Sequence, residues 1–554
     1  MVRWCMLWTL SAAAVWGAGG CDYSRYERGY PISDRALRQA GTLDLAGASL
    51  APPTTRPAVT TLPTTRGADE LAPAPAAEVR LTIEECRQLA LANNLDLRVE
   101  LFNPSIAREA IDVERAVFES VFTASTAFSV TDQPTASQLS GSSTRDWATR
   151  LGLLVPLRTG GQIRLDLPVD RFETNNQFST LNPAYSSDLA ASISHPLLRG
   201  FGPAVQSRGI RVATYQYQAT QARTKLQVIG VLADVDRLYW RLYAARQLRD
   251  VRAKEYDLAV AQLERARRQA QVGVVPEVDV VRAESGVADR IEGIIIAETD
   301  IRDRQRELKQ AINRPDLGLG TPTVVVPVSD PNALHYALDT ARLVGAAIDQ
   351  RMEMLETEIR IATEATNVAF ARNQLLPLLT IDYAYNVNGL GRSLPDSFQL
   401  LKQKRFEDHR VGFNVEVPIG NAAAESQLRR ALLSRLQAIA TKGQRALLIE
   451  REVLAAADRL EANWQRILAA QRRVILAARV VDVETRQFNQ GLRTSTDVLI
   501  AQAQLADAQS AEIAAVTEYQ IAQVDLAFAT GTVLGASRVS WEPTSLGRRP
   551  AETR

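Results

Sequence analysis

Apolar residues recur along the chain at two spacings, and each spacing predicts one kind of element. In residues 421–490 the repeat alternates between three and four positions, which is typical of a coiled-coil seam. No proline interrupts this range, so we expect one helix of about 70 residues, on the order of 100 Å long. Residues 204–272 predict a comparable helix. The seam positions, eight of them apolar, are Val453, Ala457, Leu460, Trp464, Ile467, Gln471, Val474, Ala478 and Val481.

Shorter helical patterns flank the two long ones. They cover about 276–313 and 494–530 after the long helices, and about 81–119 and 332–374 earlier in each half. In each half the two shorter helices together approach the length of the long one. We therefore expect them to stack end to end alongside it.

Strict alternation of apolar and polar residues predicts four strands, two in each half. The alternation covers residues 122–129, 188–194, 379–387 and 410–419. Such lengths suit a tilted strand that crosses a bilayer with one face toward lipid and one toward water. A soluble β-sandwich alternates in the same way, so the strand pattern alone leaves both architectures open.

The chain repeats itself at an offset of 218 positions. Gly273, Asp279, Val280 and Ala283 match Gly491, Asp497, Val498 and Ala501, in that order. An internal repeat of this kind means that one structural unit is used twice. We expect a first repeat at 80–313, a linker at 314–331 and a second repeat at 332–535, each with a long helix that turns at the glycine into a shorter one.

Composition excludes several classes of function. Among 554 residues, 64 basic and 63 acidic side chains leave a formal charge of +1, so no strong field recruits nucleic acid. His195, His335 and His409 are not in a metal-ligand spacing, and no phosphate loop or nucleophile motif is present. We therefore expect neither an enzyme nor a bound cofactor or metal.

The N-terminal segment is typical of an exported protein. Residues 1–20 carry an early arginine, an apolar run and small residues before Cys21, which indicates a signal peptide. The sequence around Cys21 resembles a bacterial lipoprotein cleavage box, with ordinary cleavage as the alternative, and Asp22 bears on sorting in some bacteria. Residues 21–79 are rich in Pro and Thr and predict a flexible tether, and 536–554 form a tail.

Over residues 80–535 the sequence resembles the TolC-type outer membrane factor family, in its lipoprotein subgroup. The resemblance rests on the paired phrases Gly273–Ala283 and Gly491–Ala501, on "FNQGLRTSTDVL" at 488–499, and on Pro196 and Pro418, which close the second strand of each half. It implies a mainly α protein with membrane β: a homotrimeric barrel with four strands per chain, continued by a periplasmic helical coiled-coil tunnel. It also implies an outer membrane channel, lipid-anchored and extending into the periplasm, that exports small molecules with a periplasmic adaptor (membrane fusion) protein and an inner membrane pump.

The resemblance assigns two roles to the duplicated turns. They would dock the adaptor, through Gly273, Val274, Val275, Pro276, Asp279, Gly491, Leu492, Thr494 and Ser495. The second turn would also form the pore constriction, through Asp497, Ile500, Phe488 and Arg493. The sequence without the resemblance supports a simpler role for Asp497, because Thr494 and Asp497 have the spacing of a capping box at the start of a helix. Three copies of Asp497 around a threefold axis would instead attract cations and raise one another's pKa.

The first half contains about 40 residues more than the second before its turn. They include two further alternating stretches, 147–156 and 161–170, joined by the turn residues Arg158 to Gly161. Such a hairpin either lengthens an extracellular rim or enlarges the barrel, and we expect the rim.

One other class of protein shares many of these features. A periplasmic coiled-coil scaffold or adaptor lipoprotein without a channel would also show export, lipidation and heptads. It would not need paired bilayer-length amphipathic strands, so we favour the channel. The substrate, and whether the cargo is a small molecule or an unfolded protein, are not encoded in these patterns.

Overall fold

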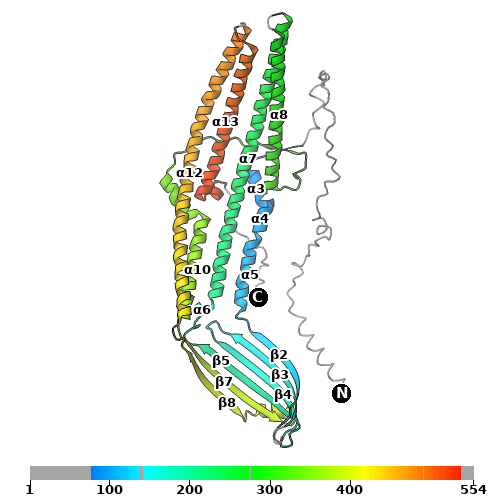
Figure 1. The fold of residues 1–554 in the computed structure, drawn as a ribbon, viewed down its shortest axis with the longest axis vertical. Helices are drawn as coiled ribbons and strands as arrows, with labels where there is room; N and C mark the ends of the chain where they lie inside the picture. The colour runs from blue at the N-terminus through cyan, green and yellow to red at the C-terminus, as the bar shows by residue number, and fades with distance from the viewer. Residues whose placement is uncertain (1–76, 136–140, 274–275, 491, 538–554) are drawn as a thin grey trace, which may run out of the picture. The chain divides into compact units, whose positions relative to one another are not determined.

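The computed structural model describes residues 77–135, 141–273, 276–490 and 492–537 (Figure 1). All of them belong to the unit Ala76–Arg554. The predictions for the signal peptide, for Cys21, for the tether up to residue 76 and for residues 538–554 concern positions outside the described residues. The same holds for Val274, Val275 and Gly491.

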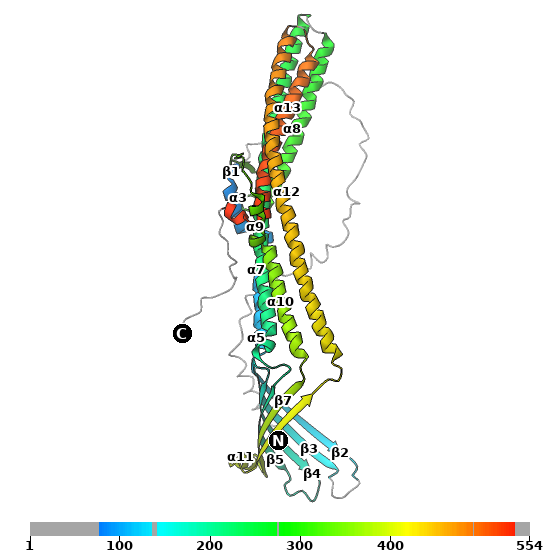
Figure 2. The same cartoon turned by 90° about the vertical axis from the view of Figure 1, so that its left-hand side faces the viewer.

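The two long helices and their shorter partners are confirmed. They are α7 (Arg208–Gln271) with α8 (Glu277–Ile312), and α12 (Ala422–Asn489) with α13 (Ser495–Thr530). Each long helix packs against the shorter helix that follows it, and α13 also packs against α7. The coiled-coil seam of α12 is buried where it meets α9 and α13, at Val453, Leu460 and Ile467. Figures 1 and 2 show the two helical hairpins running beside each other.

The other two predicted helices are each interrupted. Residues 81–119 form α3 (Ile83–Asn93), α4 (Leu95–Glu100) and α5 (Phe102–Ala116), and residues 332–374 form α9 (Thr340–Gln350) and α10 (Met352–Gln374). The first break lies at Asn94, whose side chain accepts a hydrogen bond from the N–H of Leu97 and so begins a new helix. The break between α9 and α10 lies at Arg351, which has extended backbone angles.

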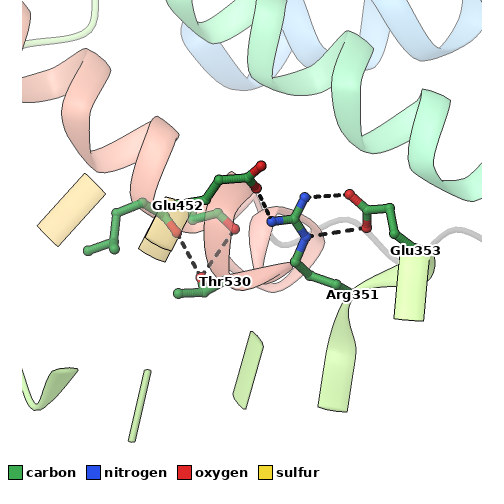
Figure 3. A network of polar contacts seen from close by, with 6 residues as sticks. Arg351, Glu353, Glu452 and Thr530 are labelled. Atoms are coloured by element: carbon green, nitrogen blue, oxygen red, sulfur yellow. Dashed lines mark hydrogen bonds and ion pairs between the residues drawn. The ribbon is translucent and has the colours of Figure 1, made fainter. Parts of the chain in front are cut away.

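Polar contacts fix the break at Arg351 (Figure 3). The Arg351 side chain is 7% exposed and lies between the carboxylates of Glu353 and Glu452, with ion pairs to both. Glu353 belongs to α10 and Glu452 to α12, while Thr530 at the end of α13 lies beside them and bonds to the carbonyl of Leu526 (2.8 Å). The buried Arg351 guanidinium thus links the start of α10 to the middle of α12.

A small core near the middle of the first half was not predicted. Strand β1 (Glu78–Leu81) crosses the expected boundary between the tether and the first repeat, and it pairs in parallel with β6 (Val324–Pro327), within the expected linker. Helix α3 packs on α7 beside this pair and buries Cys86. The Arg87 guanidinium donates two hydrogen bonds to the carboxylate of Asp236 in α7, 2.7 and 2.8 Å long.

The strands form one antiparallel sheet in the order β2-β3-β4-β5-β7-β8. Strands β2 (Val121–Asp132), β5 (Ala184–Pro196) and β7 (Leu378–Gly391) contain the first three predicted segments, and β8 (Glu407–Glu416) covers the fourth as far as residue 416. Pro196 ends β5 as expected. Strand β8 ends at Glu416, so Pro418 lies beyond it rather than closing it.

The expectation of a rim hairpin is wrong. The extra residues form β3 (Ser143–Pro156) and β4 (Gln162–Thr174), which lie inside the sheet between β2 and β5. β3 pairs with β2 from Ser143 to Leu154, and β4 pairs with β5 from Gln162 to Phe172. The predicted hairpin is present, but backbone pairing on both of its sides makes it part of the sheet.

The pairing places apolar residues of all six strands on one face of the sheet. Phe122 lies opposite Leu153, Leu153 opposite Leu165, and the row continues in register through the other strands. The residues that alternate with them along each strand, most of them polar, lie on the opposite face. The row that begins at Phe122 runs through Leu153, Leu165, Ala191 and Tyr385 to His409, and the neighbouring row on the other face runs from Thr123 through Gly152, Asp166, Ala190 and Asn386 to Asp408.

Helices join the sheet at one end and form a layer there in the order α12-α10-α7-α5 (Figure 1). Helix α5 leads into β2, α10 leads into β7, and β8 leads into α12. Strand β5 leads into α7 through the short helix α6 (Pro203–Gln206). A nine-residue helix, α11 (Leu394–Lys402), packs on β7 and β5 where β7 ends, far from this layer.

Candidate functional site: the two helical turns

The first turn follows α7 at the glycine that sequence predicted. Gly273 has φ +75°, in the left-handed region, and its N–H bonds to the carbonyl of Ala270 (3.0 Å). A side chain would strain this backbone, which explains glycine here. Pro276 is the N-cap of α8. Asp279 lies in that first turn and pairs with Arg282 (3.2 Å).

The second turn contains the predicted capping box. Thr494 is the N-cap of α13, and the N–H of Asp497 donates to its hydroxyl (3.3 Å). In return, one oxygen of the Asp497 carboxylate accepts from the N–H (2.9 Å) and the hydroxyl (2.8 Å) of Thr494. These bonds, the backbone one foremost, hold the pKa of Asp497 below its ordinary value.

Two other residues predicted for the constriction have partners within their own chain. Phe488, in the last turn of α12, is 4% exposed. Arg493 bonds through Nε to Gln487 (3.1 Å) and lies 3.3 Å from a carboxylate oxygen of Glu484. Contacts of either residue with another copy, which the resemblance implies, remain a prediction.

Ser495 holds the two turns together. Its side chain is buried and accepts a hydrogen bond from Gln262 of α7 (3.0 Å), so it is not part of an exposed docking surface. This bond joins the end of the first hairpin to the start of α13. No sequence pattern marks Gln262, because its position only becomes informative once the hairpins are packed.

Beside this bond an open groove separates α8 from α13. Ile500 lines it from α13 with a side chain that is 52% exposed, and the groove also contains Arg282, Asp289 and Arg290 of α8. Leu499 lines the same groove and lies next to Gly286. Ile500 is therefore accessible in the single chain, one turn along from Asp497.

Apolar side chains project from both turns. Val272 is 73% exposed at the end of α7, and Leu492 is 71% exposed before α13. Large apolar side chains this exposed at two neighbouring turns are typical of a protein interface.

The described ranges hold no cluster of His, Cys, Asp or Glu arranged to bind a metal ion. Within those ranges, too, every helix is either too short or too polar to span a bilayer.

Comparisons with known proteins agree with this architecture. A family model described as outer membrane efflux protein matches residues 343–532. The chain is 24% identical to the outer membrane protein TolC of Vibrio cholerae over 325 residues, 58% of this chain and 71% of that protein. It is 23% identical to the outer membrane efflux protein BepC of Brucella suis over 314 residues, 55% of this chain and 65% of that protein.

Solved structures show the same fold. The chain superposes on the channel-forming protein CusC with a TM-score of 0.62 at 15% identity, over 87% of this chain and 99% of CusC. Long helical hairpins and an antiparallel sheet at one end therefore form a TolC-like fold, and over residues 343–532 the chain is similar to the outer membrane efflux protein family.

Proposed function

We propose that this protein is the outer membrane channel of a tripartite efflux system and works as a homotrimeric, passive conduit for small molecules. The observation that carries the proposal is the six-stranded sheet with one apolar and one polar face. A sheet of this kind suits a barrel wall with lipid outside and water inside. The family match supports the efflux role.

The apolar face has the features of a lipid-facing surface. Leu165, Leu189 and Ile193 are each 37–41% exposed, although they lie in the middle of the sheet. At the end far from the helices, Trp147 stacks with Phe128 (4.6 Å between ring centroids), and Arg171 lies over Trp147. Aromatic side chains at the edge of an apolar band are typical of the membrane interface.

The sheet needs other copies of the chain to close. Within the described residues, β2 pairs only with β3 and β8 only with β7, so each has an unpaired edge. An open apolar edge in a bilayer leaves backbone groups unsatisfied, which costs several kcal/mol for each group. Pairing β8 of one copy with β2 of the next satisfies both edges and generates a ring.

The helical layer has matching edges. Helices α4 and α5 expose apolar side chains at heptad spacing, with Val99, Phe102, Ile106 and Val113 each 58–69% exposed. At the opposite edge of the layer, α12 exposes Leu433, Leu436 and Leu447. Two unpartnered seams on opposite edges suit the same head-to-tail ring, in which α12 of one copy packs against α5 of the next.

The repeats 80–313 and 332–535 then have equivalent roles at the far end of the helices. The residues at 273–276 with Asp279, and those at 491–492 with Thr494, form the turns that meet a periplasmic adaptor, and the adaptor connects the channel to an inner membrane pump. Ser495 supports these turns from inside. Asp497 and Ile500 face the pore as a charged and an apolar ring, and Phe488 and Arg493 hold the constriction closed. Cys21 carries a lipid anchor in the outer membrane.

Planar bilayers test the channel directly. The purified full-length chain should migrate as a trimer and produce discrete ion conductance after reconstitution. A monomer that shows no conductance would instead favour a scaffold.

A further inference from the structure

We propose that the inserted hairpin β3–β4 enlarges the shared barrel, so that three copies of a six-stranded sheet make a wall of 18 strands instead of twelve. This inference rests on the proposed trimeric channel. It changes the size of cargo that the membrane-spanning part would admit.

The hairpin shares the two-faced pattern of its neighbours. Leu151 on β3 and Leu165 on β4 lie on the apolar face and are 37% and 40% exposed, close to the 41% of Leu189 on β5. Arg164 and Asp166 lie on the polar face, in register with Ser192 and Ala190. A hairpin that projected into water would have no reason to keep an apolar row in register with a lipid-facing one.

The inner turn of the hairpin is fitted to the junction between sheet and helices. The N–H of Gly202, just before α6, donates to the carbonyl of Thr159 (3.0 Å), and the Thr159 hydroxyl lies 2.9 Å from Nε2 of His195. Gly160 has φ +103°, and a Cβ there would lie 2.4 Å from the carbonyl oxygen of Gly200. The turn of the hairpin therefore packs tightly against the connection between β5 and α6.

Six strands also match the width of the helical layer better than four. A strand tilted by about 40° occupies about 6 Å of circumference, so the five spacings from β2 to β8 cover about 30 Å. The three spacings from α5 to α12, at about 8–10 Å each, cover about 24–30 Å. Four strands, with three spacings, would cover only about 19 Å.

The extra width has a consequence for transport. Eighteen strands give a circumference of about 110 Å and a backbone diameter of about 36 Å, against about 24 Å for twelve. Natural barrels of 16–18 strands enclose an aqueous channel. The membrane part of this protein would therefore admit bulkier molecules than a twelve-stranded barrel, with about twice its cross-section.

Electron cryomicroscopy of the full-length chain in lipid nanodiscs tests the inference. We expect a trimer whose barrel has 18 strands. A trimeric channel with twelve strands, and the hairpin outside the wall, would overturn this inference alone. A chain that forms no trimer would overturn the proposed function together with it.

Spin labels at two adjacent leucines provide an independent measurement in the same nanodiscs. Leu153 lies on the apolar face and Leu154 on the polar face of β3. We expect a label at Leu153→Cys to be relaxed at least several-fold more strongly by oxygen dissolved in lipid than a label at Leu154→Cys, and the reverse for a water-soluble nickel chelate. Equal, purely aqueous accessibility at both positions would place the hairpin on a rim and overturn the inference.

Deletion of residues 143–174 provides the matched variant. It removes β3 and β4 and leaves β2 and β5 antiparallel, so they can pair directly. The shortened chain should form a trimer with twelve strands. If this variant does not fold, the strand count and the spin labels of the full-length chain still decide the question.

Discussion

At the scale of single residues, Arg351 links helices α10 and α12 of the second half through its two ion pairs. It is buried between Glu353 and Glu452 (Figure 3). Removing one partner of a buried ion pair leaves the other charge desolvated and costs about 3–5 kcal/mol. We expect Arg351→Ala to lower the free energy of unfolding by about this amount, measured by urea denaturation. Glu452→Ala should cost less, because Glu452 is 45% exposed.

The same cluster predicts a dependence of stability on pH. Burial alone would raise the pKa of Glu353, but hydrogen bonds from Arg351 and its charge outweigh burial, so this pKa lies below the ordinary value of 4.5. A carboxyl with a lowered pKa in the folded state stabilises the fold above its ordinary pKa, and that contribution is lost as pH falls through the lowered one.

Stability measured from pH 7 to pH 3 should therefore decline below about pH 4.5. Glu353→Gln should be less stable at pH 7 and should show a shallower decline. An equally steep decline in the variant would mean that other carboxyls cause the acid sensitivity.

Asp497 has a role that the sequence specifies only in part. Its spacing from Thr494 predicts the capping box, which the structure confirms. Whether it also faces a pore depends on other copies of the chain, because a ring of carboxylates is a property of an assembly.

Two variants of the second turn separate these roles. Asp497→Asn removes the charge and keeps a side-chain oxygen for the cap, whereas Thr494→Ala weakens the cap by about 1 kcal/mol and keeps the charge. We expect Asp497→Asn to lower the preference for cations over anions in planar bilayers, and Thr494→Ala to leave it unchanged. If the parent and Asp497→Asn showed the same preference for cations over anions, the role of Asp497 would be limited to capping α13.

At the scale of elements, heptad spacing predicted the long helices well but not the interruptions at Asn94 and Arg351. Periodicity survives a single break, because the apolar stripe resumes on the same side after one residue. The break at Asn94 had a local signal, since Asn is a favoured N-cap. The break at Arg351 depends on a partner distant in sequence, Glu452 of α12, and no local pattern reveals it.

The exposed seam of α12 yields a prediction about assembly. Leu436 is 62% exposed in the single chain and lies on the stripe that we assign to the next copy. Burying a leucine contributes about 1.5–3 kcal/mol, and burying an unpaired carboxylate costs more. We expect Leu436→Glu to convert the trimer to monomers in detergent, measured by light scattering.

Gln437→Glu is the matched control for this experiment. It adds the same charge to the neighbouring exposed position, about 100° around the helix. Dissociation by both variants would point to charge alone and count against the seam.

At the scale of the whole molecule, the alternation of apolar and polar residues predicted the two faces of the strands, including those of the inserted hairpin. It did not give the order of strands in the sheet. A β-hairpin pairs internally wherever it lies, so residues 147–170 alone fit a rim and a wall equally well. Contacts between distant residues decide the matter, such as those of Thr159 with His195 and Gly202.

Two adjacent alanines in β5 test which face of the sheet meets lipid. Ala191 lies on the apolar face, opposite Leu165 and Tyr385, and Ala190 lies on the polar face, opposite Asp166 and Asn386. An arginine on the lipid side of a membrane barrel costs about 2–4 kcal/mol near the bilayer midplane, whereas a water-filled interior tolerates it.

We therefore expect Ala191→Arg to reduce the amount of trimer in outer membrane fractions and to lower its heat-dissociation temperature. Ala190→Arg should preserve both and should shift ion selectivity toward anions, because it adds a positive charge in each copy to the aqueous side. The opposite result, with Ala190→Arg disruptive and Ala191→Arg tolerated, would invert the assignment of the two faces. If neither substitution changed the amount of trimer or its heat-dissociation temperature, neither face would be embedded in lipid. That result would remove the physical basis for the channel.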